Sequence, residues 1–131
     1  MTDQLALNQL HQIAINTDDL ATSKAFYEDV LGAKFIASYD PPGLVFFDFQ
    51  GVRLLLEKGS TPGTIYFRVD DIDDAVQKLQ AKGVEFDQLP HVIFRDDQGV
   101  FGPKGYEELM AFFKDPAGNI LSLASQRPAS S

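Results

Sequence analysis

Histidine and cysteine, which often carry acid–base and nucleophilic chemistry near neutral pH, are scarce in this sequence. There are two histidines, His11 and His91, and no cysteine, which excludes thiolate nucleophiles, disulfides and thiolate metal sites. His91 lies where a strand-like stretch leads into a glycine-rich loop. An imidazole near the opening of a pocket suits acid–base work or a ligand contact, which makes His91 a weak catalytic candidate. A half-buried strand histidine with a local hydrogen bond is the simpler interpretation.

Arg68 and the pair Glu107–Glu108 are the other charged candidates. A cation at the mouth of an aromatic-lined pocket would bind a carboxylate or phosphate, whereas a salt bridge to a nearby aspartate is the structural alternative. Paired carboxylates can do acid–base chemistry, although charges at the end of a loop are usually solvated. The sequence has no Gly-Lys-Ser/Thr phosphate loop and no GxGxxG, HExxH or GxSxG motif.

An internal repeat defines the elements that position these residues. Ile13–Leu20 and Ile65–Ile72 share a strand-like run, an Asp-Asp pair and an apolar residue that opens an amphipathic helix. The spacing predicts helices from about Leu20 to Leu31 and from about Ile72 to Lys82, each followed by a glycine. The aspartates supply acceptors and negative charge at the helix N-termini.

After each helix the pattern changes to alternation or short apolar runs, which predicts strands. We expect them at about residues 34–39, 44–49, 52–56, 84–86, 92–94, 110–114 and 119–124, with a long loop over 95–108. The fold class is therefore α+β, with two βαβββ modules at about residues 9–58 and 63–125. They form a single domain over residues 9–125, and residues 1–8 and 126–131 are expected to be tails.

The composition and charge of the chain indicate which partners and which location to expect. The formal net charge is −8, so a nucleic acid or an anionic membrane surface is not an expected partner. The apolar runs are too short to cross a bilayer, and the N-terminus lacks the basic and apolar regions of a signal peptide. We therefore expect a cytoplasmic protein.

Three stretches resemble the vicinal oxygen chelate superfamily, which comprises glyoxalases, bleomycin-resistance proteins and dioxygenases. The first is His11-Gln-Ile-Ala-Ile with Phe26-Tyr27 and Val30-Leu31-Gly32, the second is Tyr66-Phe-Arg-Val-Asp-Asp-Ile72, and the third is Asp115-Pro-Ala-Gly-Asn119 with its preceding strand. The resemblance covers roughly residues 9–125. It implies that the two modules form an incomplete β-barrel whose concave face holds a divalent metal and a small substrate.

When the family's metal-ligand positions are carried over to this sequence, the residues found there are poor metal ligands. These positions correspond to Gln12, Leu54, Thr64 and Ser122. Catalytic Zn²⁺, Ni²⁺ or Fe²⁺ prefers imidazole and carboxylate, and leucine cannot coordinate a metal. The sequence therefore predicts a divergent member with no metal site and no cofactor.

The concave face is the expected ligand site. Strand alternation and the family register predict the lining as Gln12, Phe47, Phe49, Leu54, Leu56, Tyr66, Arg68, Met110 and Ser122, with His91 at the rim. Arg68 favours an anionic or carbonyl-bearing ligand. Alternatively, the aromatic side chains fill the concave face themselves.

Three functions remain open. The first is metal-free binding of a small organic molecule, as in bleomycin-resistance proteins. The second is a glyoxalase I-like lyase or isomerase, or a thiol-transferase, in which a divalent metal occupies a non-standard site. The third is a structural or regulatory module. We also expect a homodimer, because exposed sheet edges need to be covered and two-fold dimers are common.

Overall fold

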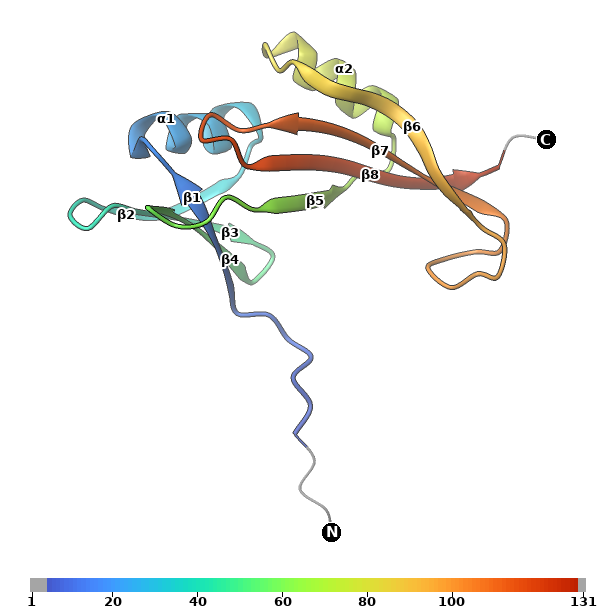
Figure 1. Cartoon of the computed structure of the whole chain (residues 1–131), viewed down its shortest axis with the longest axis horizontal. Helices are drawn as coiled ribbons and strands as arrows, with labels where there is room; N and C mark the ends of the chain where they lie inside the picture. Colours follow the sequence, from blue (N-terminus) through green and yellow to red (C-terminus); the bar gives the residue numbers. More distant parts are fainter. Residues whose placement is uncertain (1–4, 130–131) are drawn as a thin grey trace.

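The computed structural model describes residues 5–129 and contains two four-stranded sheets with helices on one side (Figure 1). The first module comprises β1 (Gln12–Thr17), α1 (Leu20–Ala25), η1 (Phe26–Val30), β2 (Lys34–Tyr39), β3 (Leu44–Phe49) and β4 (Val52–Lys58). The second comprises β5 (Thr64–Arg68), α2 (Ile72–Ala81), β6 (Phe86–Asp96), β7 (Tyr106–Lys114) and β8 (Ile120–Pro128). No helix within residues 5–129 is long and apolar enough to span a membrane.

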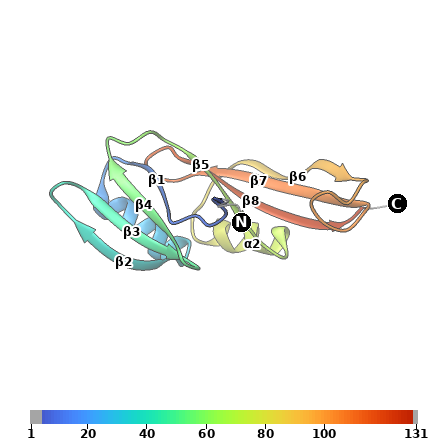
Figure 2. The same cartoon turned by 90° about the horizontal axis from the view of Figure 1, so that it is seen from below.

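The two sheets have the same topology, which confirms the paired βαβββ modules. The strand order is β1-β4-β3-β2 in sheet A and β5-β8-β7-β6 in sheet B. In each sheet the first strand runs parallel to the last, and the other neighbours are antiparallel. Figures 1 and 2 show both helices on the same side, so each sheet has a helix-facing side and an opposite side that we call the open face.

The predicted helix starts are confirmed. Asp19 caps α1 by accepting a hydrogen bond from the Thr22 N–H at 2.9 Å, and Asp71 caps α2 in the same way from Asp74 at 3.0 Å. The first helix changes after Ala25 into a π-helical turn, η1, which carries the buried Tyr27. Such turns add a residue to the helical repeat and are frequent at functional or strained positions.

The second module has longer strands than the sequence pattern predicted. β6 runs through Pro90, and irregular registers with β7 occur on both sides of this residue. Proline is tolerated there because β6 is an edge strand, whose outer side needs no N–H donor. β7 already begins at Tyr106, and β8 continues to Pro128 opposite it. The predicted loop over 95–108 and the predicted tail from residue 126 were therefore wrong, since the connecting loop is residues 97–105.

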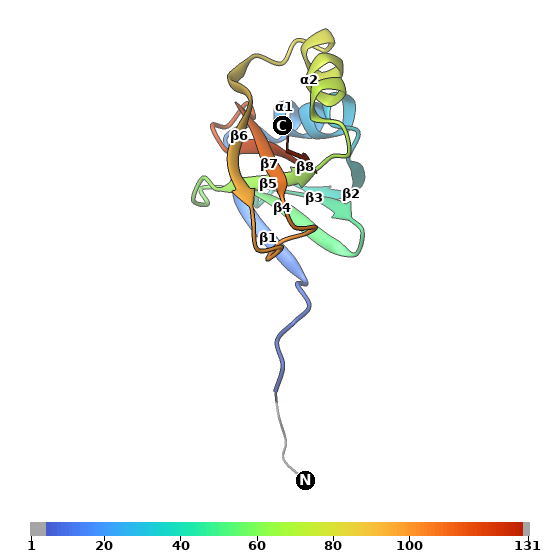
Figure 3. The ribbon, with the colours of Figure 1, turned by 90° about the vertical axis from the view of Figure 1, so that its right-hand side faces the viewer.

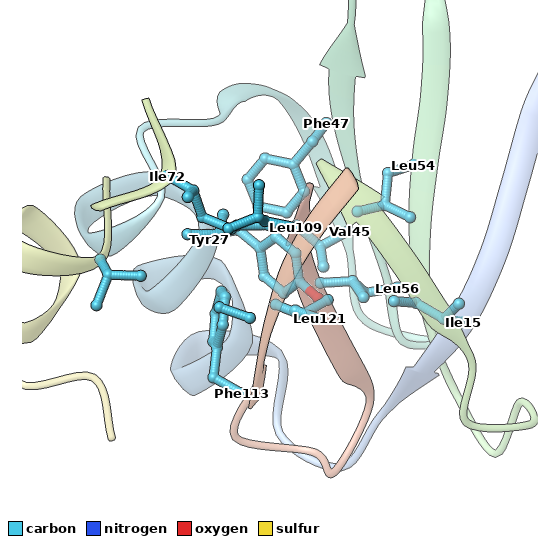
Figure 4. Packing of buried hydrophobic residues seen from close by; sticks show 13 residues of the cluster. Ile15, Tyr27, Val45, Phe47, Leu54, Leu56, Ile72, Leu109, Phe113 and Leu121 are labelled. Carbon is cyan, nitrogen blue, oxygen red and sulfur yellow. The ribbon is translucent and has the colours of Figure 1, made fainter. Parts of the chain in front are cut away.

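The hydrophobic core lies between the helices and the helix-facing sides of both sheets. Tyr27 is fully buried at its centre, with Phe47 of sheet A and Phe113 and Leu121 of sheet B also at 0% exposure. The Tyr27 and Phe47 ring centroids are 5.5 Å apart. Figure 4 shows these side chains arriving from both modules. A single core, rather than two separate ones, therefore joins the modules.

A buried polar group completes this junction. The turn between β7 and β8 places Asp115 and Asn119 at 5% and 0% exposure. The Tyr27 hydroxyl donates to Asp115 Oδ2 at 2.7 Å. Asn119 Nδ2 donates to the same oxygen and to the Asn16 carbonyl, both at 2.7 Å, and Asn119 Oδ1 accepts from the Gly63 N–H at 2.9 Å. Burial and the neighbouring Asp115 carboxylate raise the pKa of Tyr27 far above its ordinary value, so the phenol remains a donor.

We predict that Tyr27→Phe lowers the free energy of unfolding by about 1–3 kcal/mol, because a hydrogen bond to a carboxylate is lost from a buried site. Urea denaturation measures the change. Tyr39→Phe is the matched control, since Tyr39 is 54% exposed at the edge strand β2 and should change stability by less than about 0.5 kcal/mol. Equal stabilities of Y27F and wild type would show that this contact does not hold the modules together.

Candidate functional site

The strand register identifies which side chains lie on the open faces. Residues paired across neighbouring strands share a face, and successive residues alternate. In sheet A the open face carries Gln12, Ala14, Phe46, Asp48, Arg53 and Leu55. In sheet B it carries Tyr66, Arg68, His91, Met110, Phe112, Ser122 and Ala124. The structure thus places five of the predicted lining residues, Gln12, Tyr66, Arg68, Met110 and Ser122, together with His91, on open faces.

The other predicted lining residues lie on the helix side, so their assignment to the concave face was wrong. Leu54 is opposite Ile13 in the parallel β1–β4 pair, and therefore shares the face of Ile13 rather than that of Gln12. Phe47 and Leu56 belong to the buried core at 0% exposure. Phe49 packs partly against that core. The prediction matched β1 to β4 with a shift of one residue, which turns a strand over.

Aromatic rings cover part of the sheet B open face. Tyr66, Ser122 and Phe112 are neighbours across β5, β8 and β7. The Tyr66 and Phe112 rings meet edge to face with centroids 6.3 Å apart, while Ser122 beneath them has no exposed surface. The Ser122 hydroxyl donates to the Leu123 carbonyl. A ligand on this face would therefore contact the 56%-exposed Tyr66 ring before it reached Ser122.

Arg68 lies beside this aromatic cover. A hollow of about 210 Å³ is lined by Tyr66, Arg68, Glu108, Ala124, Ser125 and Gln126. Glu108 Oε1 is held by Gln126 Nε2 at 3.1 Å. Arg68 is exposed and forms no ion pair within residues 5–129, contrary to the salt-bridge alternative. The hollow therefore brings together an aromatic ring, a cation, an amide and the Glu108 carboxylate.

A second arginine, Arg53, lies at the junction of the sheets. Arg53 and Tyr66 both line a slot of about 140 Å³ between β4 and β5. Arg53 Nη2 is 2.8 Å from His11 Nε2, and its guanidinium lies 5.8 Å from the Phe46 ring centroid. Its Nε is buried and has no hydrogen-bond partner within the described residues. Strand alternation with its neighbour Leu54 places Arg53 on the face away from the core.

His91 makes a local hydrogen-bond contact, as the simpler interpretation of this residue predicted. Its Nδ1 is 2.9 Å from the Leu89 carbonyl oxygen, and the side chain is exposed on the edge strand β6. The ring centroid lies 6.4 Å from that of Phe112. His91 thus extends the aromatic row of sheet B. Among the described hydrogen bonds it has no carboxylate partner of the kind that orients a general base.

The loop of residues 97–105 borders the open face of sheet B and is anchored by Asp96. The Asp96 carboxylate accepts the Val100 N–H at 2.8 Å and the Phe101 N–H at 2.9 Å. Phe101 then packs on Phe94, with ring centroids 5.6 Å apart, and its carbonyl accepts from Gln126. Burial raises the pKa of Asp96, but the backbone N–H donors outweigh this effect and hold the pKa below its ordinary value.

Comparison with known proteins agrees with this geometry. A profile of the Glyoxalase/Bleomycin resistance protein/Dioxygenase superfamily matches residues 9–123. The chain belongs to this superfamily. A relative from Escherichia coli K12, known as uncharacterized protein YaeR, is 32% identical, with 93% of this chain and 99% of the relative covered.

Solved structures share the fold of this chain at low sequence identity. Lactoylglutathione lyase from Agrobacterium tumefaciens superposes with a TM-score of 0.70 at 22% identity, over 89% of this chain and 92% of that one. The antibiotic-binding protein TnmS3 from Streptomyces sp. CB03234 superposes with a TM-score of 0.74 at 19% identity, over 95% and 100% of the two chains. These likenesses establish the architecture.

The donor set at the superfamily's metal positions does not fit a catalytic metal. The residues of β4 that share the face of Gln12 are Arg53, Leu55 and Glu57, and Leu55, which lies on that face next to the transferred position Leu54, has no donor atom. Thr64 and Ser122 supply hydroxyls, and the Ser122 hydroxyl is already bonded to a carbonyl. Within residues 5–129 no cluster of three or more His, Asp or Glu side chains could replace these positions. Imidazole and carboxylate ligands are therefore lacking where the superfamily places them.

Because Asp96 anchors the loop, we predict that the order of the loop depends on pH. The low pKa of Asp96 means that its stabilisation of the loop is present at neutral pH and is lost as the pH falls through the folded-state pKa, which lies below the ordinary value for an aspartate. We expect the amide signals of Val100 and Phe101 to titrate together in this acid range by NMR. At neutral pH, Asp96→Asn should increase the exchange of both amides with solvent.

Asp97→Asn is the matched control, because Asp97 is an adjacent carboxylate that pairs with Arg95 at 2.9 Å. It should leave both amides unchanged. The same exchange rates in Asp96→Asn and wild type would contradict the anchoring role.

Proposed function

We propose that this protein binds a small organic anion with an aromatic or aliphatic body on the open face of sheet B, without a catalytic metal. The observation that carries the proposal is the hollow in which the exposed Arg68 lies beside the Tyr66 ring. A guanidinium binds a carboxylate or phosphate through two parallel hydrogen bonds. The aromatic wall offers apolar contact to the rest of the ligand. The antibiotic-binding protein TnmS3, which shares this fold, makes a binding role reasonable for it.

The absence of a suitable donor set supports binding rather than metal-dependent lyase or isomerase chemistry. A metal-assisted reaction needs a Lewis acid held by several strong ligands. Gln12, Leu55, Thr64 and Ser122 supply at most one amide oxygen and two hydroxyls. Elemental analysis of protein purified without chelators is expected to give well below one equivalent of Zn²⁺, Ni²⁺ or Fe²⁺. One equivalent that is lost in Gln12→Ala would instead favour the enzyme.

Phenylacetate is a suitable probe of the site, with benzyl alcohol as its uncharged counterpart. We expect phenylacetate to bind in isothermal titration calorimetry and benzyl alcohol to bind at least tenfold more weakly. Arg68→Ala should weaken phenylacetate binding by about tenfold or more, since a hydrogen bond to a charged group contributes about 1.5–3 kcal/mol.

Arg127→Ala is the matched control, because Arg127 is on β8 of the same sheet but pairs with Glu107 and with Asp73 of α2. It should leave the affinity unchanged. Equal weakening by both substitutions would assign the effect to overall charge and would contradict a site at Arg68.

We also propose that the protein is a homodimer. The extended segment of residues 5–11 leaves the body of the domain, as Figures 1 and 3 show, and exposes Leu5, Leu7 and Leu10 by 84%, 90% and 64%. Two further apolar side chains, Tyr66 and Ile120, are exposed on the open face of sheet B. Apolar surface of this extent favours association. Light scattering should give twice the chain mass of 14.5 kDa, and a mass near that of one chain at micromolar concentration would contradict the dimer.

A further inference from the structure

A groove of about 750 Å³ lies on the helix side of the molecule, apart from the hollow beside Tyr66. Its walls come from both modules: the end of η1 with the residues that follow it, the ends of β3 and β5, and α2. The wall is mainly apolar, and its principal side chains are Leu31, Ala33, Phe49, Phe67, Ala75 and Leu79. A volume of this size is within the range of about 300–1,000 Å³ that is usual for small-molecule sites.

The charge around the groove is opposite to that of the whole chain. Four cations line it, namely Lys34, Arg68, Lys78 and Lys82, with one carboxylate, Asp48. In the whole sequence 19 acidic residues outnumber 11 basic ones, so this distribution is not explained by composition.

Neighbouring groups neutralise only part of this positive charge. Lys78 forms a salt bridge with Asp74 at 2.8 Å. Asp48 stands opposite Lys34 in the β2–β3 pair and accepts the Gly51 N–H at 3.0 Å. Lys82 Nζ donates to the backbone carbonyl of Asp29 at 3.0 Å, which holds the ammonium at the groove without neutralising it. An anion there would meet Lys34, Arg68 and Lys82, none of which forms an ion pair within the described residues.

We propose that this groove binds an amphipathic organic anion, namely a carboxylate with a long aliphatic chain. The chain would lie against the apolar wall, where its burial removes hydrocarbon from water. The carboxylate would lie at the rim among the lysines, whose flexible stems let the ammonium groups reach it. Since the walls belong to both modules, one ligand would contact both. The groove shares Arg68 with the open-face hollow, but its apolar wall and its lysines lie outside that hollow, so the proposal does not require the open-face function.

Decanoate is the probe, and 1-decanol is its uncharged counterpart. Calorimetric titration of the full chain below micelle-forming concentrations should show one decanoate site per chain, with 1-decanol at least tenfold weaker. The substitution pair Lys34→Gln and Lys82→Gln, combined in one variant, should weaken decanoate binding at least tenfold. Lys104→Gln, which removes an exposed lysine of the 97–105 loop, should bind like wild type.

A second variant tests the apolar wall. Ala75→Phe places a ring in the groove without changing any charge, and should abolish decanoate binding. Its thermal unfolding and its phenylacetate affinity report whether the fold and the open face remain intact. If Ala75→Phe fails to fold, the lysine variant decides alone. Equal affinities for decanoate and 1-decanol, or wild-type affinity in the lysine variant, would overturn the proposal.

Discussion

The buried hydrogen bonds around Asp115 and Asn119 hold the two halves of this molecule in one arrangement. Asn119 contacts β1 through the Asn16 carbonyl and the start of β5 through the Gly63 N–H, while Asp115 accepts from Tyr27 of η1. A carboxylate at 5% exposure is tolerated because its oxygens receive several donors. The relative position of the sheets, and hence of every open-face residue, depends on this turn.

Much of the fold was predictable from local signals. The Asp-Asp pairs predicted the helix starts, and the capping hydrogen bonds of Asp19 and Asp71 confirm them. The repeat predicted the paired modules. Strand ends in the second module were not predictable from apolar pattern, because Glu107 and Glu108 extend β7 through cross-strand partners on β8, Arg127 and Gln126. Such pairs are visible only once the strands are aligned.

The candidate site was predictable in sheet B but not in sheet A. In sheet B, Tyr66, Arg68 and Ser122 alternate with residues of the core, so one register assignment placed them all. In sheet A, Leu54, Leu55 and Leu56 are consecutive apolar residues with exposures of 4%, 7% and 0%. A continuous apolar run does not show which residues face the helices. Pairing with β1 resolves this ambiguity and brings Arg53 to the open face.

The charge pattern links the two proposed sites. In an acidic chain, cations are concentrated around the apolar groove on the helix side, whereas the open-face hollow holds Arg68 beside an aromatic ring together with the Glu108 carboxylate. Arg68 lines both, so it lies at the boundary between them. Ligands of different body shape would therefore be distinguished by the walls rather than by the charge.

Binding of an organic anion without a metal is the function that we propose for the open face of sheet B. Amide chemical-shift mapping of metal-stripped protein with phenylacetate tests it most directly. We predict the largest shifts at Tyr66, Arg68, Gln126 and their strand neighbours, unchanged when Zn²⁺ is added. Shifts that appear only after Zn²⁺ is added, or that centre on residues outside the open face, would contradict the account.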